Sequence, residues 1–168
     1  MEIFGFIALF LLTMLPFFEL RASIPYGIWS GSVSLPFGLS LSGLGLSPLI
    51  VFPFVVIANI LLGEFIFWSL KALLPHVLKV PHMERVYGFS VKRAQKKAQK
   101  YVERYGKIGL ALFIGIPFPG SGVWSGALAA FIFGFRLKEF RAANIAGVII
   151  AGILVTLATV WGIRIFSF

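Results

Sequence analysis

Apolar residues along this 168-residue chain gather into long blocks instead of the short periodic stripes of a soluble domain. Four blocks, residues 3–18, 22–63, 108–135 and 142–163, contain no charged side chain or almost none. A helix that crosses a bilayer needs about 20 consecutive, mainly apolar residues. Two segments meet this requirement without interruption: Pro48 to Leu74, and Ala142 to about Phe166. We therefore predict two membrane-spanning helices.

The third block is interrupted near its middle by Pro-Phe-Pro-Gly-Ser-Gly at 117–122. Prolines remove backbone donors and clash with the preceding turn, so a continuous helix is excluded here. The flanking segments, Ile108–Ile116 and Val123–Phe135, are each about half a bilayer long. Irregular backbone at that depth is tolerated only where protein or water covers it. We favour a re-entrant hairpin over two short crossings joined outside. The residues of this breaker are Pro117, Pro119, Gly120, Ser121 and Gly122, with Phe118 among them.

The first part of the chain has the same construction. Ile3–Leu15 is a half-length apolar segment, and a breaker from Pro16 to Pro25 separates it from a second short one. The five letters from Gly27 to Gly31, Gly-Ile-Trp-Ser-Gly, match Gly-Val-Trp-Ser-Gly at 122–126. The sequence therefore predicts two repeats, 1–75 and 107–168, each a re-entrant hairpin followed by a spanning helix.

Charge is concentrated in the linker between these repeats. The net charge is +9, and most of the 15 Lys and Arg residues lie between Lys71 and Lys107. A basic segment between apolar blocks is typical of a cytoplasmic loop, and it argues against nucleic acid as a partner. With linker 76–106 cytoplasmic, the first hairpin opens outward and the second inward. This is the inverted-topology pair typical of transporters. We predict an all-α integral membrane protein, a single multi-pass domain over 1–168 in the cell membrane.

The linker itself carries a helical pattern. Its apolar side recurs at intervals of three and four residues, with Ser90 as a candidate N-cap and Gly106 as the stop. A basic amphipathic helix of this kind suits an anionic membrane surface. A helix resting on the protein's own cytoplasmic face has the same pattern, and both interpretations stay open. The residues of the apolar side are Tyr87, Val91, Ala94, Ala98, Tyr101 and Tyr105.

Three charged residues fall inside the apolar regions. Glu19 and Arg21 lie in the first breaker, and Glu64 lies near the middle of the first long helix. A charge at the centre of a spanning helix costs about 2.5–3.5 kcal/mol, so such residues usually serve function. We interpret the two carboxyl groups as protonatable groups for proton coupling, with Arg21 as their partner or as an anion contact. The alternative is an ion pair, Glu64–Arg21 or Glu19–Arg21, that only pins the hairpin.

Other side chains are weaker candidates. Backbone N–H groups at the second breaker, where a helix begins near Ser121, form an arrangement that attracts anions, although a tight turn has the same sequence. Intramembrane amides more often bond a neighbouring helix than a ligand. The remaining candidates for contact with substrate or for packing are Trp29, Asn59, Trp124, Arg136, Arg141 and Asn144.

Catalytic and metal sites are not indicated. No nucleophile, base and orienting residue are arranged as a set, and no Gly-rich phosphate loop follows a strand. His76, His82 and Glu84 in the linker form only a weak set of metal ligands. Cys is absent from the sequence, which excludes disulfides and thiol chemistry. We expect no enzyme, no metal and no cofactor.

Two motifs resemble known families. Glu-Leu-Arg-Ala-Ser-Ile-Pro at 19–25, with Ile-Pro-Phe-Pro-Gly-Ser-Gly-Val-Trp-Ser-Gly at 116–126, resembles the putative small multidrug export protein family over nearly the whole chain. The broken hairpins also resemble the DedA superfamily (VTT, or SNARE-associated, membrane proteins). That resemblance implies movement of phospholipids or polyprenyl-phosphate carrier lipids. Its second hairpin typically carries arginines, whereas here none lies between Lys107 and Arg136.

Three functional hypotheses follow. The first is a proton-coupled secondary transporter that exports a small or amphiphilic molecule. The second is a flippase or scramblase of phospholipid or polyprenyl-phosphate carrier lipid. The third is a membrane scaffold whose basic linker recruits partners. Membrane lipids and a small-molecule or lipid substrate are the expected partners, and a homo-oligomer is left open.

Overall fold

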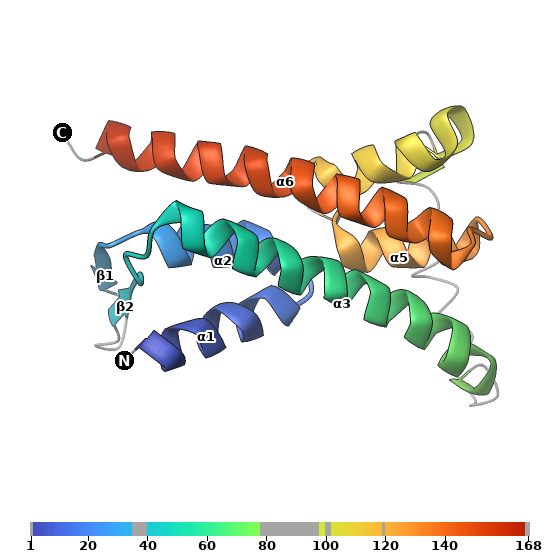
Figure 1. The fold of residues 1–168 in the computed structure, drawn as a ribbon, viewed down its shortest axis with the longest axis horizontal. Coiled ribbons are helices and arrows are strands. Elements are labelled where there is room, and N and C mark those ends of the chain that lie inside the picture. Colours follow the sequence, from blue (N-terminus) through green and yellow to red (C-terminus); the bar gives the residue numbers. More distant parts are fainter. Residues whose placement is uncertain (1, 35–39, 78–97, 100–101, 119, 167–168) are drawn as a thin grey trace. The chain divides into compact units, whose positions relative to one another are not determined.

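A computed structural model describes residues 2–34, 40–77, 98–99, 102–118 and 120–166. Residues 102–115 form a helix that precedes α5. The chain clusters into two compact units, Met1–Asn59 with Ala151–Phe168, and Ile60–Ile150. The elements shown in Figure 1 are α1 (Glu2–Met14), α2 (Glu19–Ile28), β1 (Ser32–Ser34), β2 (Ser40–Ser42), α3 (Pro48–Val77), α5 (Val123–Ile132) and α6 (Leu137–Phe166).

The elements follow one another in a repeated order. α2 and α5 each have 10 residues, and α3 and α6 each have 30. Each ten-residue helix follows an apolar helix and a turn that contains Pro-Phe, at 16–17 in the first half and at 117–118 in the second. The helices thus follow one another in the same order and with similar lengths in the two halves, and β1 and β2 lie between α2 and α3 in the first half.

The two long helices match the predicted spans closely. Segments Pro48–Leu73 of α3 and Leu137–Ile163 of α6 are long and apolar enough to cross a membrane. α6 begins at Leu137, so the predicted start at Ala142 was too late. The reason is a cap, because the carboxylate of Glu139 accepts the backbone N–H of Arg136 at 3.0 Å. The same carboxylate forms an ion pair with Lys107 Nζ at 3.2 Å. This ion pair compensates the charge of Glu139 in the first turn of α6.

The first breaker is shorter than the sequence analysis predicted. α1 ends at Met14 and α2 begins at Glu19, so only residues 15–18 interrupt the helix. Phe17 and Glu19 have φ of 75° and 45°, and these left-handed residues turn the chain. Pro25 lies inside α2, so placing it in the breaker was wrong. α1 and α2 lie side by side as a helical hairpin (Figure 1).

The shared Gly-x-Trp-Ser-Gly pattern occupies opposite ends of the two short helices. In the first copy, Ile28 is the last residue of α2 and Trp29 is its C-cap. In the second copy, Gly122 is the N-cap of α5 and Trp124 lies in its first turn. Aligning the repeats on this pattern was therefore wrong. The Pro-Phe turn before each short helix marks the equivalent position.

Two short strands join α2 to α3, although the sequence predicted an all-α protein. β1 pairs antiparallel with β2, with Ser32 opposite Ser42 and Val33 opposite Leu41. The strands read Ser-Val-Ser and Ser-Leu-Ser. Each alternates polar and apolar residues, but three residues are too few for this periodicity to indicate a strand.

Most of the predicted linker helix lies outside the described residues, as does Ser90. Of its apolar side, Ala98 is fully buried, whereas Tyr105 is 50% exposed. Gly106 has φ of 55°, a left-handed residue inside the helical segment 102–115. The predicted stop at Gly106 was therefore wrong, because the helix continues past this residue to 115 despite its left-handed φ.

Candidate functional site

A bidentate ion pair joins the two long helices in the second unit. Arg141 donates from Nε to Glu64 Oε1 at 2.7 Å and from Nη2 to Glu64 Oε2 at 2.9 Å. Paired hydrogen bonds between ionised groups are among the strongest that side chains form. The Glu64 and Arg141 side chains are 26% and 49% exposed on the protein surface. An unpaired charge on a membrane-spanning helix is costly, so each side chain stabilises the other.

The partner of Glu64 is thus Arg141, whereas the sequence analysis considered Arg21. Glu64 lies near the middle of α3, but Arg141 is the fifth residue of α6, about 6 Å from its start. The pair therefore sets Glu64 level with the beginning of α6. Sequence spacing carries no signal for this contact, because 77 positions separate the two residues.

A buried amide lies next to this pair. Asn144 Nδ2 donates to the carbonyl oxygen of Ile60 at 3.0 Å, so α6 is bonded directly to α3. Asn144 is fully buried, and its Oδ1 has no hydrogen-bond partner within the described part of the chain. A Cβ at Gly63 would lie 2.6 Å from Asn144 Nδ2, so only glycine allows this close approach. Glu64, Arg141 and Asn144 form one polar cluster, which we call the α3–α6 cluster.

Asn59, also on α3, is fully buried in the first unit. Neither amide atom of its side chain has a hydrogen-bond partner among the described residues. An unpaired amide in an apolar environment costs free energy, so buried polar groups usually bind water or another polar group. Asn59 is therefore a candidate contact for a water molecule or for a polar atom of a substrate.

A second polar group lies in the first hairpin. Glu19 is 2% exposed and is the first residue of α2, where the helix dipole favours a negative charge. Ser23 Oγ donates to the carbonyl oxygen of Glu19 at 2.8 Å, and Thr13 Oγ1 lies 3.0 Å from Ser23 Oγ. Arg21 is partly buried on the same helix. Hydroxyl groups thus bond α1 to α2 beside the buried carboxyl residue.

Ser121 holds the second breaker. Its Oγ lies 2.6 Å from the carbonyl oxygen of Ile116 and 2.7 Å from that of Phe118. Gly120 and Gly122 have φ of 85° and 105°, conformations that favour glycine. Pro119 lies outside the described residues, and Pro117 is exposed. These contacts support the tight turn that the sequence allowed.

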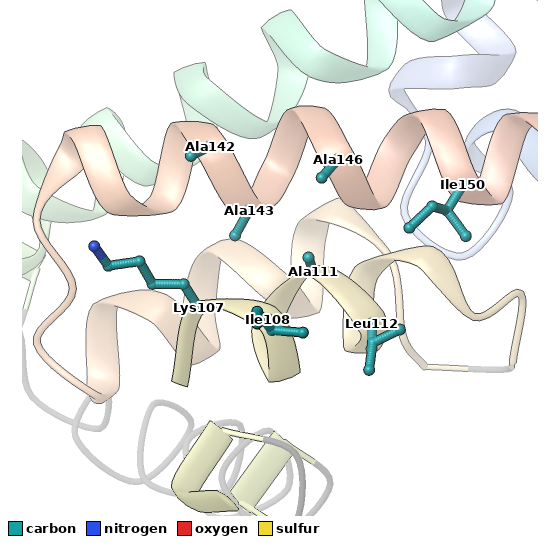
Figure 2. A pocket seen from close by; sticks show the side chains of 8 residues that line it. All are labelled: Lys107, Ile108, Ala111, Leu112, Ala142, Ala143, Ala146 and Ile150. Atoms are coloured by element: carbon teal, nitrogen blue, oxygen red, sulfur yellow. The ribbon is translucent and has the colours of Figure 1, made fainter. Parts of the chain in front are cut away.

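A narrow groove lies in the second unit between the helix 102–115 and α6 (Figure 2). Its volume is about 300 Å³, and Lys107 lies at one end of it. Arg136 and Lys138 are exposed near the start of α6. A groove of about 320 Å³ also lies on the first hairpin and has no basic residue in its lining. The residues lining the Lys107 groove are Lys107, Ile108, Ala111, Leu112, Ala142, Ala143, Ala146 and Ile150.

Metal ligands do not gather in the part of the chain that the structure describes, where no three His, Cys, Asp or Glu residues lie close enough to hold an ion. His82 and Glu84 lie outside the described residues. Trp29 is partly buried after α2, and Trp124 is 37% exposed on α5. The structure thus brings together two of the candidate residues, Arg141 and Asn144, around Glu64.

Comparison with known proteins adds one match. The family model described as "Putative small multi-drug export protein" matches residues 19–154, from the start of α2 into α6. The matched segment contains Glu19, Arg21 and the whole α3–α6 cluster. No curated protein and no solved structure matches the chain. The resemblance to the DedA superfamily is not shown by these comparisons.

Proposed function

Because the chain belongs to the putative small multi-drug export protein family, we propose that it is a membrane transporter that uses a proton gradient to export a small or amphiphilic molecule. The family description and the two long apolar helices support membrane transport in general. Proton coupling is our own addition, and it is supported by the α3–α6 cluster.

The observation that carries the proposal is the ion pair between Glu64 and Arg141. Protonation of Glu64 would remove the negative charge that Arg141 faces and would weaken both hydrogen bonds. The guanidinium would then become available to another partner, such as an anionic or polar group of the substrate. Proton binding and substrate binding would therefore be linked through a single contact between two spanning helices.

We further propose that the two repeats have inverted topology, with re-entrant hairpins and a cytoplasmic linker 76–106. The repeated order of elements supports a repeat, and the basic linker supports its orientation. In such an architecture the transport site lies near the broken helices. Glu19 at the first breaker would then be a second protonatable group on the substrate route.

Transport by purified protein in liposomes tests the proposal. Vesicles with an acidic lumen should accumulate a fluorescent lipophilic dye faster than vesicles without a pH gradient, because protons leave as dye enters. A protonophore should abolish the difference, and protein-free liposomes give the background. A cationic, an anionic and a neutral dye should be compared. Accumulation that does not depend on the gradient for any of them would exclude proton-coupled export of these classes.

The second candidate is a flippase or scramblase of phospholipid or polyprenyl-phosphate carrier lipid. It is favoured by the basic residues at the start of α6, where Arg136 and Lys138 are exposed and Lys107 lies at the end of an apolar groove. A fluorescent phospholipid in the same liposomes distinguishes the two functions. A scramblase, or a flippase that needs no gradient, would move the labelled lipid between leaflets without a pH gradient, whereas the proposed exporter would not.

A further inference from the structure

The Lys107 groove has one charged end and one apolar end. Lys107 is the only charged residue in its lining, and the other lining side chains are aliphatic. Figure 2 shows Lys107 at one end, with Leu112 and Ile150 at the other. Small side chains on α6, above all Ala142 and Ala146, leave the space open. The shape and chemistry suit an elongated apolar ligand with an anionic head.

The depth of the groove matches one leaflet of a bilayer. Lys107 pairs with Glu139, the third residue of the span Leu137–Ile163, so the charged end lies at the membrane interface. From Ala142 to Ile150 the groove follows α6 for about 12 Å. Half of the hydrocarbon core is about 15 Å thick. The groove therefore extends from the interface towards the midplane, as a lipid chain does.

The basic side chains near the interface end outnumber its carboxylate. Lys107, Arg136 and Lys138 lie with Glu139 around the start of α6, and Arg141 is engaged by Glu64. Among the described residues, no carboxylate forms an ion pair with the side chains of Arg136 or Lys138. Basic pockets between membrane helices on the cytoplasmic side bind anionic lipid headgroups.

We propose that this groove is a binding site for an anionic phospholipid, which lays one acyl chain along Ala142 and Ala146 and places its phosphate at Lys107. The occupant is a lipid of the surrounding bilayer, and its binding does not depend on the transport proposed above. The groove on the first hairpin provides a comparison within the molecule. It has a similar volume but no basic lining residue, so it should not distinguish anionic from neutral lipids.

Larger side chains in the groove test where the acyl chain of the lipid lies. Ala146→Leu and Ala142→Leu add bulk at exposed positions of the groove, and Ala158→Leu makes the same change at an exposed position of α6 that does not line it. Native mass spectrometry of the detergent-solubilised protein, titrated with phosphatidylglycerol, measures binding. We expect both groove variants to bind phosphatidylglycerol with an affinity about tenfold lower. Excluding two methylene groups of the acyl chain from the groove is enough to lower the affinity by that factor. The Ala158→Leu protein should bind like the wild type. Equal binding by Ala146→Leu, Ala142→Leu and Ala158→Leu would overturn the proposal.

Neutralising Lys107 tests whether the groove recognises the anionic headgroup of the lipid. Lys107→Gln should weaken phosphatidylglycerol binding about fivefold and leave phosphatidylcholine binding unchanged, because one basic residue at the surface contributes about that factor. Lys71→Gln removes the same charge from an exposed position of α3 outside the groove and should have no effect. Loss of phosphatidylglycerol preference in both variants, or in neither, would show that the site does not select the headgroup. Competition by soluble glycerol phosphate would show that a free anion suffices, and it would also overturn the proposal.

Discussion

Glu64 and Asn144, two polar side chains in the apolar helices, bond to residues that are distant in the sequence. Glu64 was recognised as exceptional from the sequence because ionised residues are rare within a spanning segment. Its partner could not be predicted, since the charged residues around Arg141 are equally typical of a cytoplasmic helix end. The small residue Gly63 gave no signal of its own, although it allows Asn144 to reach Ile60. The residue type of Glu64 thus indicated the candidate site, and the packing of α6 against α3 determines which side chains lie beside it.

Gly63 provides the first prediction. Gly63→Ala should destabilise the protein by about 1–3 kcal/mol, the usual cost of overpacking, because its Cβ would meet the Asn144 amide at 2.6 Å. Gly162→Ala is the matched control on α6, since nothing lies within 4 Å of a Cβ at that position. Thermal unfolding in detergent, followed by tryptophan fluorescence, measures both. A Gly63→Ala protein as stable as Gly162→Ala would contradict the close packing described here.

At the scale of elements, hydrophobic block lengths and prolines predicted most of the helices. The two long helices and the break at 117–122 agree with the structure because length and proline content decide them locally. The first breaker was predicted too long, since it was placed from Pro16 to Pro25 although α2 runs from Glu19 through Pro25 to Ile28. The shared Trp-Ser-Gly letters misled the alignment of the repeats, because short matches carry no information about which end of a helix they occupy.

The second breaker provides the next prediction. Ser121→Ala removes the hydroxyl group that bonds the carbonyl oxygens of Ile116 and Phe118. The turn should therefore loosen, and the free energy of unfolding of the variant should fall by about 1 kcal/mol. Ser125→Ala on α5 is the matched control, where a smaller effect is expected. Thermal unfolding and protease susceptibility near residues 116–122 report the difference. Similar behaviour of the two variants would show that Ser121 does not hold the turn.

For the whole molecule, the predicted arrangement in the membrane rests on charge and helix length. The basic linker predicts which side is cytoplasmic, and two long helices with two broken segments predict an inverted pair. The sequence could not decide whether 107–135 is a re-entrant hairpin or two short crossings, because both return the chain to the same side. Block length and loop charge are identical in the two cases, so accessibility has to distinguish them.

Single cysteines in this Cys-free chain test the topology. Ser47 and Gln99 are exposed and lie on either side of α3 in the sequence, and Phe118 is exposed in the second breaker. In intact cells, an impermeant maleimide should label Ser47→Cys and leave Gln99→Cys and Phe118→Cys unlabelled. Labelling of Phe118→Cys from outside would indicate two short crossings. Labelling of Gln99→Cys from outside would reverse the predicted orientation.

The most direct test of proton-coupled transport is the pH dependence of dye uptake by Glu64→Gln in liposomes. Gln keeps the shape of the side chain but cannot exchange a proton. Glu139→Gln is the matched control, because Glu139 also forms an ion pair at α6 but lies outside the α3–α6 cluster. The double variant Glu64→Gln/Arg141→Gln removes both charges and so controls for an unpaired arginine. Thermal unfolding confirms that each protein is folded.

We predict that uptake by Glu64→Gln and by the double variant no longer responds to an acidic lumen, while Glu139→Gln responds like the wild type. Proton-driven uptake by Glu64→Gln at the wild-type rate would contradict the proposal, because the only group that links the proton to the ion pair would then be dispensable.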